Sequence, residues 1–400
     1  MSQSSSRLLM RVAAAHSVSH VHIMTVPAML PLLPGAMGVG FVDLGLAISV
    51  FNGVSAVAQA PLGFIVDRVG AKPMLMSALA LGTLSYLLLA VYPAYFCLLL
   101  CMAVAGFANG IYHPADYSLL SRGIESNRMG RAFSLHTCAG SLGGALTPPV
   151  MVGLGVAWGV RWAFAAAALA GLLSLAYLAF GDRHAAAVAP AAKKSPGPGK
   201  PKVAIPIAAI GVLTFMFMLL SLSTGSIERF SVTSLMQGFG VPLSTANMAL
   251  TAYMFAVACG VLAGGFLADR TSRHGMLAGG AFAAAALLVV VVICVPLPAP
   301  LLVGIMGAVG FLAGMVSPSR DMLVRAASPA GAEGRTFGIV STGFNVGGVA
   351  GPVLFGYLID RGWPTGVLWA TVLLMSVTAI IVMLQERRSV GRPGVAASRA

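Results

Sequence analysis

The sequence predicts an all-α integral membrane protein in which twelve transmembrane helices form two pseudo-symmetric six-helix bundles. Hydrophobic residues make up 58% of the 400 residues and charged residues only 9%, whereas soluble proteins average about 25% charged residues. Uncharged apolar stretches recur along the whole chain, and one bilayer crossing needs about 20 such residues. Helices are expected because lipid offers the backbone no hydrogen-bond partner and the stretches lack the alternation of barrel strands.

Twelve candidate spans can be placed in order along the chain. The first six are 12–34, 44–66, 73–92, 94–115, 132–156 and 162–180. The last six are 203–227, 243–267, 275–295, 299–319, 336–358 and 364–384. Short connections such as 91–95 and 296–300 carry proline, which suits tight helical hairpins. Trp158, Trp162 and Trp363 stand at the outer ends of spans six and twelve, where indole rings favour the headgroup level.

The formal net charge of +13 is distributed as a topology signal. With an inward N-terminus, only Arg161, Arg229 and Arg361 of the 24 basic residues fall at outer connections. Basic residues near span ends hold their loops in the cytoplasm. We therefore expect a multi-pass protein of the cell (inner) membrane with both termini cytoplasmic. No basic stripe interleaved with aromatic residues points to nucleic acid as a partner.

Residues 182–202 interrupt the hydrophobic pattern with four prolines, two glycines and five basic residues. This composition is typical of a flexible linker, which we place in the cytoplasm. It divides the chain into an N-terminal bundle, 1–181, and a C-terminal bundle, 203–386, which is followed by a cytoplasmic tail, 387–400. The second half repeats the first at offsets of 202 and 204 residues, with glycines, prolines and charges in register, which indicates an internal duplication.

The stretch GFIVDRVGAK between spans two and three carries the clearest repeated motif. Its marked positions are Gly63, Asp67, Arg68, Gly70 and Lys72, and the weaker second copy contains Gly265, Asp269 and Arg270. The first glycine permits close helix approach, and the aspartate can face the positive N-terminus of a helix from the other half. Such a contact would latch the inner side shut; alternatively, the basic residues only fix topology.

Two six-span halves, a basic central linker and this motif together resemble the major facilitator superfamily over nearly the whole chain. The resemblance implies a transporter that binds its substrate near the midplane between the halves. It also implies that spans one, four, seven and ten line the cavity and that Asp116, near the inner end of span four, joins the latch. HSVSHVH, PAMLPLLP and YHPAD look like the fosmidomycin-resistance branch, and GSLGGALTPP loosely resembles the pattern of drug–proton antiporters.

Several polar residues within the spans are candidates for contact with substrate or protons. They are His16 and His20 on span one, Asn109 and His113 on span four, and His136 on span five. Polar groups inside a bilayer usually face the bundle interior and mark a pathway, and histidine is the side chain most suited to exchanging protons. The alternative is that each histidine only hydrogen-bonds a neighbouring helix. Four imidazoles could hold a metal by ligand type, but we expect no metal site.

Glu228 and Arg229 are expected to close span seven at its outer end, either as a proton carrier and its partner or as a mark of the interface. Asp43 follows a glycine-rich turn and precedes an apolar run, so helix capping is its expected role. The five cysteines fall inside spans without CxxC spacing, which predicts neither a zinc site nor disulfides.

The expected function is proton-coupled export, by antiport and alternating access, of a small polar or anionic solute. A cationic substrate is less favoured because the cavity spans offer few carboxylates. Proton-coupled or facilitative uptake of a small metabolite, or a receptor without flux, are the alternatives. No enzyme is expected, because HExxH, GxSxG, an intramembrane aspartate pair and a P-loop do not occur. The expected partners are a small solute, protons and lipid, with a monomeric chain and no cofactor.

Overall fold

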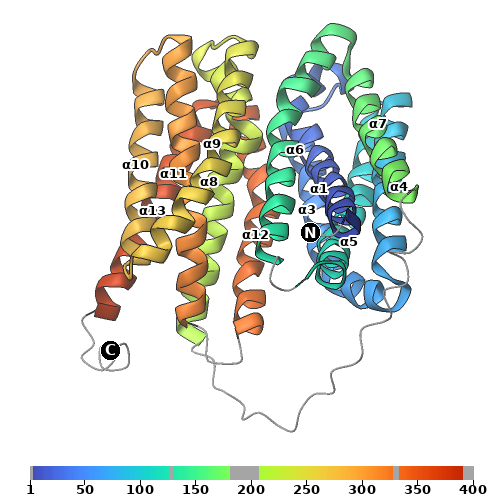
Figure 1. Ribbon diagram of the computed structural model, residues 1–400. Helices are drawn as coiled ribbons and strands as arrows, with labels where there is room; N and C mark the ends of the chain where they lie inside the picture. The colour runs from blue at the N-terminus through green and yellow to red at the C-terminus, as the bar shows by residue number, and fades with distance from the viewer. Residues whose placement is uncertain (1–2, 126–128, 181–206, 328–332, 391–400) are drawn as a thin grey trace. The chain divides into compact units, whose positions relative to one another are not determined.

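The computed structural model describes residues 3–125, 129–180, 207–327 and 333–390, and every regular element within them is an α-helix (Figure 1). In the first half these helices are α1 (Gln3–Met29), α2 (Leu33–Met37), α3 (Phe41–Val69), α4 (Ala71–Val91), α5 (Tyr95–Gly123), α6 (Met129–Trp158) and α7 (Val160–Ala179). In the second half they are α8 (Ile207–Phe239), α9 (Leu243–Arg270), α10 (His274–Cys294), α11 (Ala299–Ala327), α12 (Glu333–Asp360) and α13 (Thr365–Val390).

Eleven of the described helices, α3 to α13, are long and apolar enough to cross a bilayer. The short α2 and the longer α1 fall outside this set. Helix α1 has 27 residues, which is sufficient length, but it contains His16, His20 and His22, whose imidazoles lower its mean hydropathy. The expected all-α membrane fold is confirmed, and its first span is the most polar because it carries these histidines.

Helix α8 extends far beyond the expected end of span seven at residue 227. It runs to Phe239 as a single helix of 33 residues, and Gly240 follows it with φ +65°. The prediction that Glu228 and Arg229 close the span at its outer end is therefore wrong, because both lie well inside the helix. The charged pair does not break the helix, since no glycine or proline occurs between Arg229 and Gly238 to end it.

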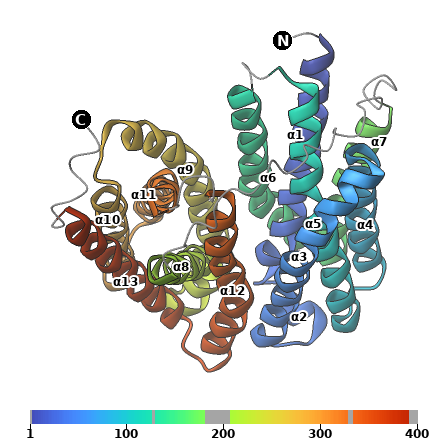
Figure 2. The same ribbon diagram turned by 90° about the horizontal axis from the view of Figure 1, so that it is seen from below.

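The helices divide into two compact units. The first unit contains residues 1–200 together with Pro352–Asp360, and the second contains residues 201–351 and 361–400. Within the first, α1 packs on α6, α3 on α5, and α4 on both α5 and α7. Within the second, α9 and α10 pack on α11, which Figure 2 shows end-on beside α8. The expected linker, 182–202, lies outside the described residues.

The same glycine contact joins corresponding helices in each unit. A Cβ at Gly106 of α5 would overlap the carbonyl of Phe51 of α3, and a Cβ at Gly310 of α11 would overlap the carbonyl of Tyr253 of α9. These positions are related by the sequence offsets of 204 and 202 residues. Only glycine lets the two backbones approach so closely, so the repeated glycines preserve one packing geometry in both halves.

Asp43 and Asp360 both stabilise the start of α3. The Asp43 carboxylate accepts a hydrogen bond of 3.0 Å from the backbone N–H of Gly40, which confirms its expected capping role. Asp360, at the end of α12 and within the first unit, accepts hydrogen bonds from the N–H groups of Phe41 (2.9 Å) and Val42 (2.7 Å). Two carboxylates thus satisfy backbone donors that the helix leaves unpaired and oppose its positive end.

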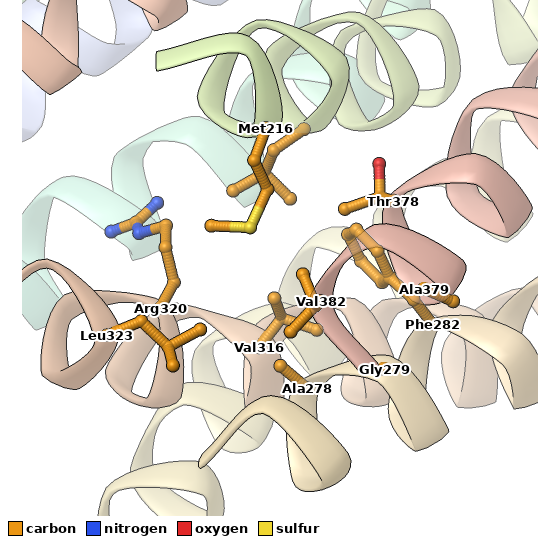
Figure 3. A pocket seen from close by; sticks show the side chains of 11 residues that line it. Met216, Ala278, Gly279, Phe282, Val316, Arg320, Leu323, Thr378, Ala379 and Val382 are labelled. Carbon is orange, nitrogen blue, oxygen red and sulfur yellow. The ribbon is translucent and has the colours of Figure 1, made fainter. Parts of the chain in front are cut away.

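A narrow crevice with a mostly apolar lining lies inside the second unit. Figure 3 shows a crevice between α8, α10, α11 and α13, lined mostly by apolar side chains such as Met216, Phe282 and Val382. Its volume is about 10 Å³, whereas a single water needs about 10–15 Å³. The crevice is therefore too small to hold a solute.

Candidate functional site

Four histidines and one aspartate from three helices meet inside the first unit. We call His16 and His20 of α1, His113 and Asp116 of α5, and His136 of α6 the histidine–aspartate cluster. The His16 ring stacks on the His136 ring with centroids 3.8 Å apart and an interplanar angle of 25°. The centroids of His20 and His113 lie 4.8 Å and 5.5 Å from that of His16. The structure thus brings together all four histidines that the sequence singled out.

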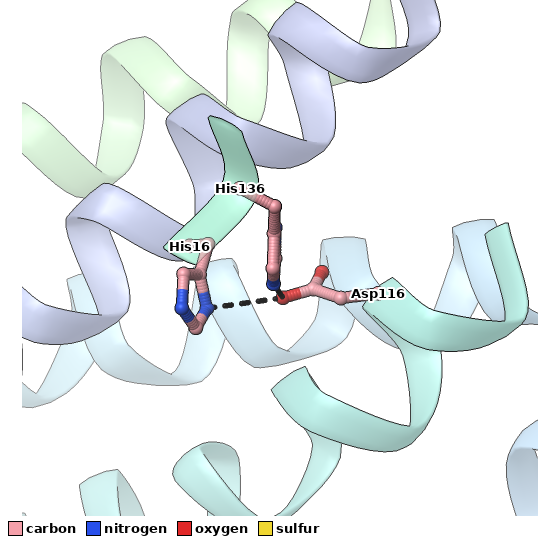
Figure 4. A group of neighbouring side chains, drawn as sticks. All are labelled: His16, Asp116 and His136. Carbon is pink, nitrogen blue, oxygen red and sulfur yellow. Dashed lines mark ion pairs between the residues drawn. The ribbon is translucent and has the colours of Figure 1, made fainter. Parts of the chain in front are cut away.

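Asp116 lies at the centre of the cluster, and its carboxylate is fully buried. Its Oδ2 atom is 3.3 Å from Nδ1 of His16 and 3.7 Å from Nε2 of His136. Figure 4 shows both rings directed at this carboxylate. The His16 and His136 side chains are also buried, with 5% and 1% of their surface exposed. A carboxylate and two imidazoles therefore share a site that water barely reaches.

Most polar atoms of the cluster lack a hydrogen bond within the part of the chain that the structure describes. These atoms are Nδ1 of His16 and His113, both ring nitrogens of His136, and both carboxylate oxygens of Asp116. Leaving a buried polar group unpaired costs about 1–3 kcal/mol. Among the described residues, Asp116 Oδ2 and the rings of His16 and His136 are thus held by ion-pair contacts of 3.3 Å and 3.7 Å and by no hydrogen bond.

Two glycines of α6 make room for these side chains. A Cβ at Gly140 would lie 2.6 Å from Cδ2 of His16 and 2.9 Å from Cδ2 of His20. One turn later, a Cβ at Gly143 would overlap the Ser17 carbonyl oxygen. Gly140 and Gly143 of GSLGGALTPP therefore permit close packing of α6 on α1.

His22 and Asn109 lie apart from the cluster. His22 Nε2 is 3.1 Å from the carbonyl oxygen of Ala167, and the backbone oxygen of His22 accepts a hydrogen bond from the Tyr86 hydroxyl. Asn109, which we expected in the cavity, donates a hydrogen bond of 2.8 Å to Oγ of Ser55. Both residues join helices of the first unit to one another.

The motif between α3 and α4 contacts a different face of α5 from the one that carries the cluster. The Asp67 side chain is 70% exposed, and its Oδ1 is 3.5 Å from the guanidinium of Arg122. Arg122 follows Asp116 by six residues, which turn a helix through about 600° and so place the two on different faces of α5. In this structure Asp116 contacts His16 and His136, whereas Asp67 contacts Arg122; a role of Asp116 in the latch stays a prediction.

The glycines of this motif have separate roles. A Cβ at Gly63 would make ordinary contact with Pro114, at 3.9 Å, so the helices are close there without requiring glycine. Gly70 has φ +106°, a conformation that L side chains rarely adopt, and it forms the turn between α3 and α4. The Arg68 side chain is exposed and that of Lys72 is half-buried at this turn.

Comparison with known proteins identifies the family. The family model described as Major Facilitator Superfamily matches residues 12–233 and 213–399. The chain belongs to the Major Facilitator Superfamily. It is a multi-pass membrane transporter with the alternating-access fold of that superfamily, and it is not an enzyme. The resemblance that the sequence predicted is confirmed.

Two curated relatives extend this assignment. An uncharacterized MFS-type transporter of Bacillus subtilis, YfnC, is 27% identical over 394 residues, which cover 95% of this chain and 93% of the relative. The fosmidomycin resistance protein of Escherichia coli is 24% identical over 272 residues, 66% of each chain. A crystal structure of a bacterial homolog to the lysosomal transporter Spinster, inward-facing and unoccupied, has the same fold with a TM-score of 0.74. It is 14% identical, and the match covers 97% of this chain and 98% of the homolog.

The candidate residues in the second half of the transporter are more dispersed. Glu228 and Arg229 are half-buried on α8, between the fully buried Ser226 and Ser231. The Arg270 guanidinium lies 3.7 Å from the centre of the Phe266 ring. The side chain of Asp269 lies outside the described residues. The described contacts thus bring no second cluster together around these positions.

Sequence reasoning missed Arg320 of α11, a charged residue within a candidate span of the transporter. Its guanidinium lies over the rings of Phe217 (4.9 Å) and Phe344 (5.2 Å) and donates a hydrogen bond of 2.8 Å to Asp321. The offset of 204 residues that relates the two halves assigns Arg320 to the position of Asp116. Applying this offset to polar as well as glycine positions could have found it.

Proposed function

We propose that this transporter exports a small polar or anionic solute in exchange for protons. The observation that supports the exchange is the buried histidine–aspartate cluster, in which one carboxylate contacts two imidazole rings. Polar groups within membrane helices usually line a pathway for ions, protons or substrate. Two imidazolium rings stacked 3.8 Å apart would repel each other, so the cluster can hold one extra proton more readily than two. It is therefore suited to taking up and releasing a single proton.

The direction and the solute are inferred from different features. Export is favoured by the similarity to a fosmidomycin resistance protein, because resistance follows when a transporter lowers the internal concentration of a drug. The cluster offers a single carboxylate among four imidazoles, so a cationic solute finds little compensating charge there. We place the chain in the cytoplasmic membrane with both termini inside, on the distribution of its basic residues, and we propose that it works as a monomer, as the two-half fold of the family contains a complete transport unit.

We also propose that the motif from Gly63 to Lys72 gates the inner side, with the weaker copy at Asp269 and Arg270 in the second half. Asp67 is accessible and its partner Arg122 is 3.5 Å away. An exposed ion pair contributes little to stability, so it can open and close at low energetic cost. This property suits a contact that must form and break in every transport cycle.

Transport of labelled fosmidomycin into proteoliposomes tests the function. An inward flux that rises when the lumen is made acidic relative to the outside would show exchange for protons. Asp116→Asn should abolish this response while keeping downhill counterflow, whereas Asp43→Asn, which changes a helix cap outside the cluster, should retain it. Flux that is the same with and without a pH gradient would rule out proton coupling. If fosmidomycin is not transported, a thermal-shift screen of metabolites and antibiotics supplies the next probe.

A further inference from the structure

We infer that His16, Asp116 and His136 form a binding site for a divalent transition-metal ion. We call these three residues the triad. The inference concerns the same cluster as the proposed function, since a bound ion and a proton would compete for the same atoms. Metal binding to the purified protein can be measured without any gradient or solute, so either proposal can fail while the other holds. It also revises the expectation from sequence that the chain has no metal site.

The distances within the triad match those between ligands around one ion. Zn²⁺ binds imidazole nitrogen and carboxylate oxygen at about 2.0–2.2 Å, and tetrahedral ligands at this distance are about 3.3–3.6 Å apart. Oδ2 of Asp116 is 3.3 Å from Nδ1 of His16 and 3.7 Å from Nε2 of His136. One ligand atom from each residue lies within 4.8 Å of both others. The distances to Asp116 need shifts of only a few tenths of an ångström, and the two imidazole nitrogens must approach each other by at most about 1.2 Å, to complete three metal bonds.

The types of ligand define the class of metal. Two imidazoles and one carboxylate suit Zn²⁺, Co²⁺, Fe²⁺ or Mn²⁺, whereas Mg²⁺ and Ca²⁺ prefer oxygen ligands and Cu⁺ prefers sulfur. Three protein ligands leave a coordination position open, as in sites whose metal also binds a small molecule. The His20 and His113 rings stand beside the triad and can bind that fourth group or take its place.

The unpaired atoms of the cluster are explained by such an ion. Nδ1 of His16, Nε2 of His136 and Oδ2 of Asp116 are buried and have no hydrogen bond within the described chain. A dication would bind all three at once and neutralise the buried carboxylate. Among the described residues, the carboxylate and the two rings contact one another as ion pairs of 3.3 Å and 3.7 Å, and an ion between them would replace these contacts.

An ion can reach the triad from one side. His113 is only half-buried, and Tyr117, one turn further along α5, is 46% exposed. The Tyr117 ring centre lies 6.0 Å from that of His113 and 6.1 Å from that of His136. These side chains form the boundary between the buried triad and the surface of the first unit, so their rearrangement would admit an ion.

The first test uses the wild-type protein in detergent. Titration with Co²⁺ should give the visible absorption of a four- or five-coordinate site, saturating at one ion per chain, and Zn²⁺ should displace it. X-ray absorption at the bound metal should show only nitrogen and oxygen ligands, with the multiple scattering of imidazole. Absence of binding would overturn the inference. So would sulfur ligands, which would point to Cys97 and Cys101, whose Sγ atoms are 3.8 Å apart.

The second test identifies the ligands. Loss of groups that merely orient metal ligands costs about 10–100-fold in affinity, so His16→Ala, Asp116→Asn and His136→Ala should each weaken Co²⁺ binding by at least about 100-fold. His274→Ala and Glu228→Gln remove a histidine and a carboxylate of the second unit and should leave affinity unchanged. Tight binding retained in all three triad variants would overturn the assignment. If a variant does not fold, the spectra of the wild-type protein still decide.

Discussion

Replacement of Gly143 by alanine tests the packing that creates the cluster. Gly143 lies on the face of α6 that meets α1, and an added Cβ would overlap the Ser17 carbonyl oxygen and lie 2.6 Å from Ser17 Oγ. Ordinary van der Waals contact begins at 3.4 Å, so the distance from the added Cβ to Ser17 Oγ would be 0.8 Å too short. The distance to the carbonyl oxygen would be shorter still. A carbonyl cannot rotate away as a side chain can, so α1 and α6 must separate.

Gly153→Ala on the same helix provides the matched control. A Cβ there would meet nothing within 4 Å, so both variants share the gain in helix propensity, about 1 kcal/mol, and differ only in packing. Overpacking of this kind costs about 1–3 kcal/mol. One kcal/mol shifts the melting temperature of a 150–250-residue domain by about 2–4 °C, and less in a longer chain. We therefore expect Gly143→Ala to melt several degrees below Gly153→Ala.

The same variant should also disturb the triad. His16 is the residue before Ser17, so a separation of 0.8 Å moves one ligand away from the other two, whereas metal sites tolerate about 0.2 Å. Melting curves and Co²⁺ titrations in detergent measure both effects. Equal melting temperatures for the two variants, together with wild-type Co²⁺ affinity, would refute the close packing of α6 on α1.

Three further outcomes follow from the contacts of the first unit. Asp67→Asn should change the free energy of unfolding by less than about 1 kcal/mol, because the residue is 70% exposed, but it should alter the transport rate. A large loss of stability would argue against a gating role. Asn109→Ala should cost about 1 kcal/mol by removing the hydrogen bond to Ser55, and its effect should be non-additive with Ser55→Ala in a double-mutant cycle; additive effects would contradict the bond. Co²⁺ affinity should fall as the pH is lowered, because a proton and the metal compete for the same carboxylate and imidazole atoms of the triad; an affinity that rises on acidification would contradict ligation by these groups.

The spans were predictable because lipid imposes length and apolarity on each helix. The exception is α8, where the charges of Glu228 and Arg229 suggested an end that the structure does not have. A helix ends where the backbone can leave it, and this occurs at Gly240, just before Pro242. Glycine and proline therefore predict the end of α8 better than the charges of Glu228 and Arg229 do.

The cluster was only partly predictable. His16 and His20 are four residues apart and His113 and Asp116 are three apart, so each pair shares a helix face. That spacing could have placed Asp116 beside the histidines, but family resemblance assigned it to the latch. His22 lies on another face of α1, where it packs against α4 and α7. Which helix meets which face depends on tertiary packing, and the apolar pattern of these helices does not encode it.

The duplication preserved packing but not chemistry. Gly106 and Gly310 make the same contact in their own units, because any side chain there would force two helices apart. At the offset of 204 residues, however, Asp116 corresponds to Arg320, and His113 and His136 correspond to Ser317 and Val340. Within the residues that the structure describes, a site built from imidazoles and a carboxylate therefore occurs in the first half and has no counterpart at the matching positions of the second. A metal stoichiometry of two ions per chain would place a second ion where the described side chains offer no comparable ligands, and would contradict this asymmetry.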